Sequence, residues 1–365
     1  MQPIPISDLK IQYQYLKNEI DAAIQNCLET AQFVGGNAVT AFENNLADYI
    51  GIKHVIGCAN GTDALQLALM ALNLPKGSKI IVPAFTYIAP IEVIRFLGHE
   101  IVYADVDTET FNITLEEIKK VYTDDVRAII VVHLYGQPCN INEIYAFAQH
   151  KNIYLIEDNA QSVGAEKNIT RNSIITTSFF PSKNLGSYGD GGAVMTNNDT
   201  LAKDIRMIAN HGQSTRYYYE LVGINSRLDT IQASILDVKL KYLDNFIAAR
   251  QKAADFYDEQ LKDIQHIQIP TRIDKNQHTF YLYTLKIKNG FRNELQSFLK
   301  EKQITSVIHY PIASYLQNAY LDKTIHLKNT EDLCEQVLSI PIYPEITHEQ
   351  LSYICDAIKL FFADQ

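Results

Sequence analysis

Two residues in the sequence have the chemistry to bind and activate a small molecule. Lys183 lies in the stretch 178–192, SFFPSKNLGSYGDGG, where Pro181 and four glycines could hold a lysine rigidly in a crevice. Asp158 directly follows an apolar run, and a carboxylate at a buried strand end needs a cationic partner or several donors. Taken singly, each residue also fits a plainer interpretation, namely a solvated lysine in a surface turn and an aspartate that caps a helix.

Two further segments could hold the anionic and the flat parts of a ligand. The segment 58–63, CANGTD, follows a predicted strand and opens a predicted helix, so its backbone N–H groups and the Thr62 hydroxyl would suit a phosphate. A plain helix cap is an equally good interpretation of this segment taken alone. Tyr87 stands at the start of the next predicted helix, where its ring could stack on a flat ligand, whereas Phe85 is expected in the core.

Together these groups meet the needs of an aldehyde cofactor that has a heteroaromatic ring, a phosphate and a basic ring nitrogen. Such a cofactor needs a lysine that forms a Schiff base, a carboxylate opposite the ring nitrogen, a ring for stacking and a phosphate cradle. Asp158 precedes Lys183 by 183 − 158 = 25 residues, which leaves room for a loop and a strand between them. The order of the four groups therefore fits pyridoxal 5'-phosphate (PLP).

The elements that must position these groups alternate between strand and helix. Apolar runs predict strands at 54–58, 80–83, 101–106, 128–133 and 153–157. Periodic apolar positions between them predict helices at 62–72, 88–97, 115–122 and 141–150. This alternation indicates an α/β fold with a mostly parallel sheet that helices cover on both faces. Ligands bind at the carboxyl ends of such strands, which is where the four groups stand.

The remaining sequence predicts a second, smaller α/β domain. We expect a large domain at 1–245, which includes N-terminal helices, and a small C-terminal domain at 246–365. A long helical stretch without Pro or Gly, at 228–261, connects the two. The other elements predicted outside the alternating region are helices at 15–32, 39–50, 200–210, 292–302 and 349–362 and strands at 279–287 and 305–309.

Composition restricts the classes of function. The chain has 365 residues, 47% of them hydrophobic, and a net charge of 32 − 42 = −10, which argues against broad binding to nucleic acid or anionic membranes. Its five cysteines are scattered and include no CxxC pair, so we expect reduced thiols and no metal site. No leader-like segment and no apolar stretch of membrane-spanning length occurs, so a soluble, cytoplasmic protein is expected. The sequence also lacks GxGxxG and P-loop motifs.

Several longer motifs, taken together, resemble one known family. They are EDNAQS (157–162), SFFPSKNLG (178–186), GDGGA (189–193), NSRLD (225–229), CANGTDAL (58–65) and IHYP (308–311). The sequence is similar over essentially its whole length to the DegT/DnrJ/EryC1/StrS sugar aminotransferases. This resemblance implies PLP fold type I, which is the aspartate aminotransferase fold, the cofactor PLP, and a homodimer with two shared active sites.

The resemblance also implies roles for single residues. Lys183 would form the Schiff base and carry a proton between the cofactor carbon and the substrate carbon. Asp158 would keep the ring nitrogen protonated, so that the ring acts as an electron sink. Gln161 would lie beside the ring hydroxyl, and Tyr87 would stack on the ring. The residues implied for the phosphate are Gly61, Thr62, Asp63, Ser178 and, from the neighbouring subunit, Asn225.

A second set of residues is expected near the substrates. The set is His309, Tyr310, Arg227 and Tyr188, with the first two near the sugar by resemblance. Arg227 would bind an anionic group of either substrate, although an Arg–Asp pair within its own loop is an equal alternative. One segment departs from the family, because residues 166–177, EKNITRNSIITT, are shorter than usual and contain no glycine. The loop geometry of this segment cannot be carried over from the family.

The reaction implied is the transfer of an amino group from L-glutamate to a keto group on a nucleotide-linked sugar, for surface polysaccharides or other amino sugars. The motifs favour a 3-keto sugar linked to UDP or dTDP, with amination at C4 as the alternative. A PLP-dependent sugar dehydratase would carry His in place of Lys183, so the lysine argues against that enzyme. A non-catalytic PLP-binding regulator is the alternative from another class, which the absence of a clear helix-turn-helix segment and of a basic face disfavours.

Overall fold

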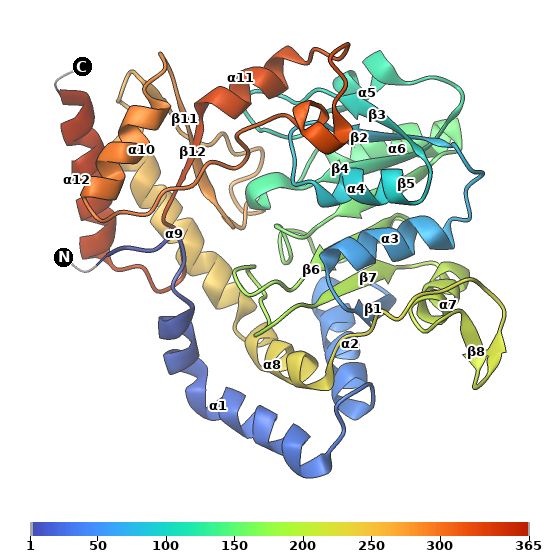
Figure 1. Cartoon of the computed structure of the whole chain (residues 1–365). Coiled ribbons are helices and arrows are strands. Elements are labelled where there is room, and N and C mark those ends of the chain that lie inside the picture. The colour runs from blue at the N-terminus through green and yellow to red at the C-terminus, as the bar shows by residue number, and fades with distance from the viewer. Residues whose placement is uncertain (1–2, 364–365) are drawn as a thin grey trace.

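The computed structural model describes residues 3–363 and contains a seven-stranded sheet as its central element (Figure 1). The strands lie in the order β1-β7-β6-β5-β4-β2-β3, and of these seven only β7 runs antiparallel to its neighbours. The mostly parallel mixed sheet expected from the sequence is thus confirmed. Its strands are β1 His54–Cys58, β2 Lys79–Pro83, β3 Glu100–Ala104, β4 Val126–Val132, β5 Tyr154–Asp158, β6 Ile174–Ser178 and β7 Gly192–Thr196.

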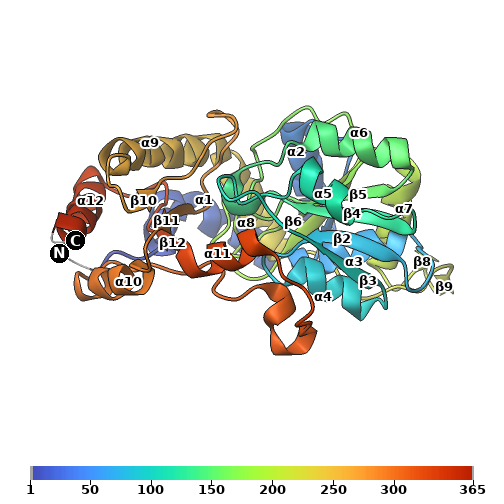
Figure 2. The same ribbon diagram turned by 90° about the horizontal axis from the view of Figure 1, so that it is seen from above.

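Helices cover both faces of this sheet (Figure 2). Successive side chains of a strand point to opposite faces, and β2 shows the consequence. Ile80 and Val82 pack in the layer of α3, α4 and α7, whereas Ile81 packs on the other side with α5 and α6. The helices around the sheet are α2 Asn37–Ile50, α3 Gly61–Ala71, α4 Ala89–Phe96, α5 Leu115–Val121, α6 Ile141–Lys151, α7 Asp199–Ile208 and α8 Thr230–Leu240.

The C-terminal part builds a second, three-stranded antiparallel sheet in the order β10-β11-β12 (Figure 1). Ile4 is buried in the core of this part. Two backbone hydrogen bonds hold it there, since Ile4 N donates to Gln303 O at 2.8 Å and Thr305 N donates to Ile4 O at 2.9 Å. The N-terminal segment therefore crosses the division predicted at 245/246, and that division stays a prediction. The elements of this part are β10 Ile267–Gln268, β11 Tyr283–Ile287, β12 Val337–Ile340, α9 Leu243–Leu261, α10 Arg292–Glu301, α11 Lys328–Gln336 and α12 His348–Ala363.

The sequence predicted one helical stretch at 228–261, whereas the structure has two separate helices there, α8 and α9. Helix α8 packs Leu236 and Leu240 against the layer of the central sheet. The later turns of α9 bury Tyr257 and Leu261 in the C-terminal core. One straight helix could not face both cores, so the chain turns at residues 241–242 without needing Pro or Gly.

Three smaller features complete the fold. The predicted strand at 305–309 forms a single bridge, between Val307 and Ser339. Residues 213–219, which include three consecutive tyrosines at 217–219, form a hairpin, and helix α1 packs against α8. No helix within residues 3–363 is both long and apolar enough to cross a membrane. The elements not yet named are α1 Leu9–Thr30, β8 Gln213–Thr215, β9 Tyr218–Tyr219 and the short 3-10 helices η1 Leu134–Gly136, η2 Ser314–Leu316 and η3 Asn318–Tyr320.

Candidate active site

The ends of β1 and β6 meet the start of β7 and form a cradle that only glycines permit. Gly192 pairs in register with both Cys58 and Ser178. A Cβ atom on Gly61 would lie 2.6 Å from Ser178 Cβ, and one on Gly192 would lie 2.4 Å from Asn60 O. Both contacts are too short for any side chain, so the backbone must approach closely at these two positions.

Helix α3 begins at this cradle. Asn60 caps the helix, and its Oδ1 accepts the Asp63 N–H at 2.8 Å. Gly61 and Thr62 precede Asp63 in the first turn, where backbone N–H groups have no partner inside the helix, and the cap uses only the N–H of Asp63. The structure therefore brings together Gly61, Thr62, Asp63 and Ser178 in an arrangement that suits an anion.

Asp158 ends β5 in a buried position, with 7% of its surface exposed. The Ala160 N–H donates to its Oδ1 at 3.0 Å, and no other donor from residues 3–363 reaches the carboxylate. Burial raises the pKa of Asp158, while the Ala160 N–H and the charge of Lys183 oppose this shift. A buried carboxylate with a single protein donor is prepared to receive a cationic partner.

Lys183 lies half-buried in the loop between β6 and β7. Its backbone N–H donates to Phe180 O at 2.8 Å, which closes a tight turn after Pro181. Its amine stands 4.3 Å from the ring centroid of Tyr281, a residue that no sequence motif had singled out. The amine charge also affects the pKa of Asp158 and of His309, so these groups share one site.

Gln161 connects the site to two tyrosines. Its Oε1 accepts the Tyr135 N–H at 2.7 Å, and its Nε2 donates to the Tyr310 hydroxyl at 3.3 Å. The ring of Tyr87 lies 6.2 Å from that of Tyr310, and Tyr87 is 56% exposed. Tyr87 therefore has an open ring face at the mouth of the site, as its predicted stacking role requires.

His309 stands on the C-terminal side of the site. Its Nδ1 lies 3.0 Å from Ser339 Oγ, and its carbonyl accepts a hydrogen bond from the Tyr135 hydroxyl. Burial and the nearby Lys183 charge lower the pKa of His309 to about 4. The imidazole is therefore neutral at physiological pH, and it can hydrogen-bond a substrate hydroxyl without carrying charge.

Within residues 3–363, three predicted site residues form no hydrogen bond or ion pair with Lys183 or Asp158. Asn225 and Arg227 are exposed, and Arg227 lines a hollow with Lys203. Among the described residues Arg227 forms no ion pair, so the alternative of an Arg–Asp pair within its loop is not observed. Tyr188 instead lies 6.1 Å from the Tyr13 ring.

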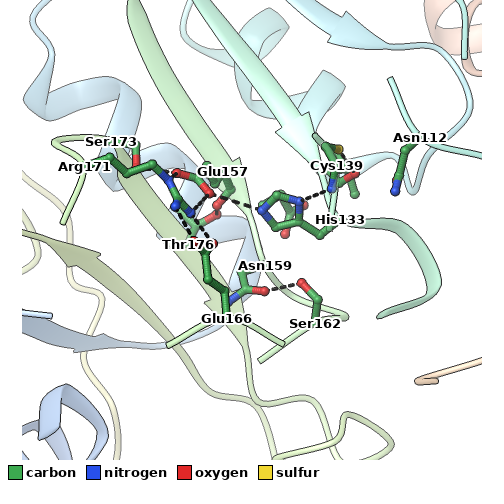
Figure 3. Close-up of polar contacts among 12 residues, drawn as sticks. Asn112, His133, Cys139, Glu157, Asn159, Ser162, Glu166, Arg171, Ser173 and Thr176 are labelled. Carbon is green, nitrogen blue, oxygen red and sulfur yellow. Dashed lines mark hydrogen bonds and ion pairs between the residues drawn. The ribbon is translucent and has the colours of Figure 1, made fainter. Parts of the chain in front are cut away.

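A buried ion-pair network surrounds Glu157 (Figure 3). Glu157 precedes Asp158 in β5, so the two side chains point to opposite faces of the sheet. Glu157 is fully buried, and Arg171 Nε and Nη2 each donate to its carboxylate at 2.6 Å. Arg171 also donates twice to Glu166 at 2.6 Å. Both Glu166 and Arg171 belong to segment 166–177, so the short glycine-free loop is shaped by a buried arginine.

The network continues to the strand that neighbours Asp158. His133 Nε2 lies 3.2 Å from Glu157 Oε2, and the Cys139 N–H donates to His133 Nδ1 at 3.1 Å. Since Nδ1 accepts a hydrogen bond, the imidazole is in its Nε2–H form and donates to Glu157. The His133 N–H donates to Asp158 O at 3.1 Å, which ties the network to the backbone of the site.

The residues that sequence patterns missed share one property. Tyr281, Tyr135 and Arg171 come from segments with ordinary strand or loop patterns, and only folding brings them to the site.

All five cysteines are buried and free. Within residues 3–363 no group of His, Cys, Asp and Glu side chains has an arrangement that could hold a metal ion.

Comparisons with known proteins agree with this geometry. The profile of the DegT/DnrJ/EryC1/StrS aminotransferase family matches residues 14–359. A UDP-2-acetamido-2-deoxy-3-oxo-D-glucuronate aminotransferase from Pseudomonas aeruginosa is 42% identical over 359 residues, which cover 97% of this chain and 99% of the relative. A dTDP-3-amino-3,6-dideoxy-alpha-D-galactopyranose transaminase from Aneurinibacillus thermoaerophilus is 38% identical over 377 residues. This match covers 98% of this chain and 99% of the relative.

A solved structure gives the same result for the fold. The crystal structure of DesV from S. venezuelae matches this chain with a TM-score of 0.95 at 33% identity, and 99% of each chain is covered. The predicted α/β architecture of PLP fold type I and the prediction of an aminotransferase are therefore confirmed. The strand-end cradle, the buried Asp158 and the loop of Lys183 are features of a protein that belongs to the DegT/DnrJ/EryC1/StrS aminotransferase family.

Proposed function

We propose that this protein uses PLP to transfer an amino group from L-glutamate to C3 of a nucleotide-linked 3-keto sugar. The observation that carries the proposal is the position of Asp158, a buried carboxylate with one protein donor, in the same site as Lys183. A protonated ring nitrogen would complete the bonding of this carboxylate. The glycine-lined cradle at Gly61 and Gly192 has the close backbone approach that a phosphate needs.

The residues of the site fit the parts of PLP. The first turn of α3 and Ser178 would hold the phosphate, Asp158 the ring nitrogen, Gln161 the ring hydroxyl and Tyr87 one ring face. When bound, PLP supplies an electron sink that allows the C–H bond beside the amino group to break. Lys183 would take that proton on its amine and return it to a different carbon, so one residue serves as base and then as acid.

The substrate proposal rests on the relatives and on the mouth of the site. Both relatives described above act on 3-keto or 3-amino sugars by name, and the UDP-linked one is the more similar, at 42% against 38% identity. We therefore propose a UDP-linked 3-keto sugar, with a dTDP-linked one as the second choice. His309 and Tyr310 would face the sugar, because neutral imidazole and phenol groups can hydrogen-bond hydroxyls.

The same proposal includes a homodimer in the cytoplasm and a role in surface-polysaccharide or other amino-sugar synthesis. Asn225 and Arg227 are exposed in their own chain, which supports their placement in the site of the partner. Mixing Lys183→Ala with Asn225→Ala tests the shared site. Equal mixing of exchanging dimers should restore about a quarter of the wild-type activity, because half the dimers then contain one intact site. No restoration would argue against a shared site.

The function itself is tested with purified full-length protein. Reconstitution with PLP should give a yellow protein whose colour fades with glutamate, and a panel of UDP- and dTDP-linked 3- and 4-keto sugars should reveal the substrate by its mass change. Lys183→Ala is the matched control, since it should keep the fold and lose turnover. A protein that shows no colour change with any amino donor would overturn the proposal, and stable DNA binding in that case would favour a regulator.

A further inference from the structure

Tyr281 is the nearest aromatic side chain to the Lys183 amine. The amine lies 4.3 Å from the centroid of the Tyr281 ring, a distance typical of cation–π contacts. The Tyr281 hydroxyl lies 3.3 Å from Ser182 Oγ, the neighbour of Lys183 in the chain. One side chain therefore contacts both the reacting amine and the loop that carries it.

Tyr281 is held in place from two sides. On one side, Arg250 is buried in α9 and its Nη1 donates to the Tyr281 carbonyl at 3.4 Å and to Ile342 O at 2.7 Å. On the other side, Leu282 N donates to Tyr135 O at 3.2 Å. A Cβ on Gly136 would lie 2.9 Å from Tyr281 N, so the two backbones are in close contact.

The electrostatic surroundings of Tyr281 agree with a direct interaction with Lys183. Burial alone would raise the pKa of the Tyr281 phenol, but the charge of Lys183 and the hydrogen bond with Ser182 reverse the effect, and the pKa is lowered. A cation 4.3 Å from the centroid of an aromatic ring is attracted by the ring face, so the Tyr281 ring holds a protonated amine more strongly than a neutral one. The hydroxyl interacts with the same amine and with Ser182, so both parts of the Tyr281 side chain face the lysine loop.

We propose that Tyr281 is a positioning residue for Lys183, whose ring face and hydroxyl hold the free Lys183 amine beside the reacting carbons and stabilise its protonated form. The inference rests on the proposed function, in which Lys183 takes a proton from one carbon and returns it to another. While the lysine carries that proton, Tyr281 keeps the ammonium from turning away or losing the proton to solvent. The phenol keeps its own proton, so the transfer remains balanced within Lys183.

The ammonium is predicted to be less stable when Tyr281 is replaced. Tyr281→Leu removes the ring face and the hydroxyl, whereas Tyr281→Phe removes only the hydroxyl. A cation–π contact of ordinary strength corresponds to a shift of about half to one and a half pH units in the titration of the lysine. The shift is towards lower pH, because losing a contact that favours the charged amine makes deprotonation easier.

The test measures the Lys183 amine directly. The full-length enzyme is loaded with pyridoxamine phosphate, which leaves Lys183 free, and is pulse-labelled with an amine-acylating reagent across a range of pH. Mass spectrometry of the Lys183 peptide then gives the pH midpoint of labelling. Lys151, whose amine lies 4.9 Å from the surface ring of Tyr122, is the internal control, and its midpoint should not change in any Tyr281 variant.

We expect the Lys183 midpoint to fall by about one pH unit in Tyr281→Leu and by less in Tyr281→Phe. We also expect kcat to fall with little change in KM, and the limb of its pH profile to move in the same direction. A midpoint equal to that of the wild type in both variants would overturn the inference. Should the Leu variant fail to fold, Tyr281→Met, which also removes the ring, decides, and an unshifted midpoint there with unchanged kcat is the negative result.

The two proposals fail in different ways. If the wild type binds neither PLP nor pyridoxamine phosphate, the proposed function is wrong, whatever Tyr281 does. If the wild type transaminates normally and the pH midpoint of Lys183 labelling does not change when Tyr281 is replaced, only the inference about Tyr281 is wrong.

Discussion

The buried pair of Glu157 and Arg171 allows a quantitative prediction. In Arg171→Met, Glu157 keeps its hydrogen bonds from Ser173 and His133 but loses two charge-assisted bonds of 2.6 Å. Removing one partner of a buried ion pair costs about 3–5 kcal/mol, because the other charge remains in the interior. We therefore expect the free energy of unfolding to fall by this amount at neutral pH.

The pKa of Glu157 gives a similar value for how much its ion pairs stabilise the folded protein. Burial alone would raise it, but His133 and Arg171 lower it from 4.5 to about 2. A shift of that size corresponds to about 3 kcal/mol of stabilisation. Because the folded-state pKa is lowered, the wild type has this contribution above about pH 4.5 and loses it as the pH falls towards 2.

In Arg171→Met, the cost of burying Glu157 should decrease as the pH falls, which is the opposite of the effect in the wild type. Without Arg171, burial dominates and raises the pKa of Glu157, so its protonation relieves the cost as the pH falls. The difference in stability between wild type and Arg171→Met should therefore be largest near neutral pH and smaller at about pH 5. Glu157→Gln combined with Arg171→Met removes both charges and should recover much of the lost stability.

Urea unfolding of the full-length protein, at one fixed protein concentration, measures these differences. Arg127→Met is the matched control, since Arg127 is exposed and donates to Asp124 O at 2.9 Å, and it should change stability by about 0.5 kcal/mol or less. The reasoning is refuted if Arg171→Met costs under about 1 kcal/mol, or if the double variant is as unstable as the single one.

Three further predictions concern the site and its supports. Gly61→Ala places a Cβ atom 2.6 Å from Ser178 Cβ and should weaken PLP binding by about tenfold or more, as measured by spectral titration; unchanged affinity would argue against the cradle. Asp158→Asn should reduce kcat by about a hundredfold or more with the melting temperature nearly unchanged, because a neutral amide cannot balance a protonated ring nitrogen. Asp105→Ala removes the cap that accepts the Thr330 N–H at 2.8 Å and should cost about 1–2 kcal/mol in urea unfolding.

The sequence predicted the central sheet because its strands depend on local patterns. The strand at 54–58 was predicted with the observed bounds, since a short apolar run between turn residues has few alternatives. Asp158 and Lys183 are candidates from the sequence because each stands where such a run ends, and parallel strands end at one edge of a sheet. The predicted helix at 228–261 was wrong in its continuity, because the two cores that divide it lie far from it in sequence.

What the sequence determined by itself was therefore the set of strands and the residues at their ends. Tertiary structure decided which other side chains meet them. Tyr281 reaches Lys183 only because Arg250 and the Tyr135 loop fix the backbone that enters β11. Arg171 becomes buried only because Glu157 offers it a carboxylate under the sheet. Local propensity cannot encode such contacts, since their free energy depends on desolvation and on partners that folding alone brings within reach.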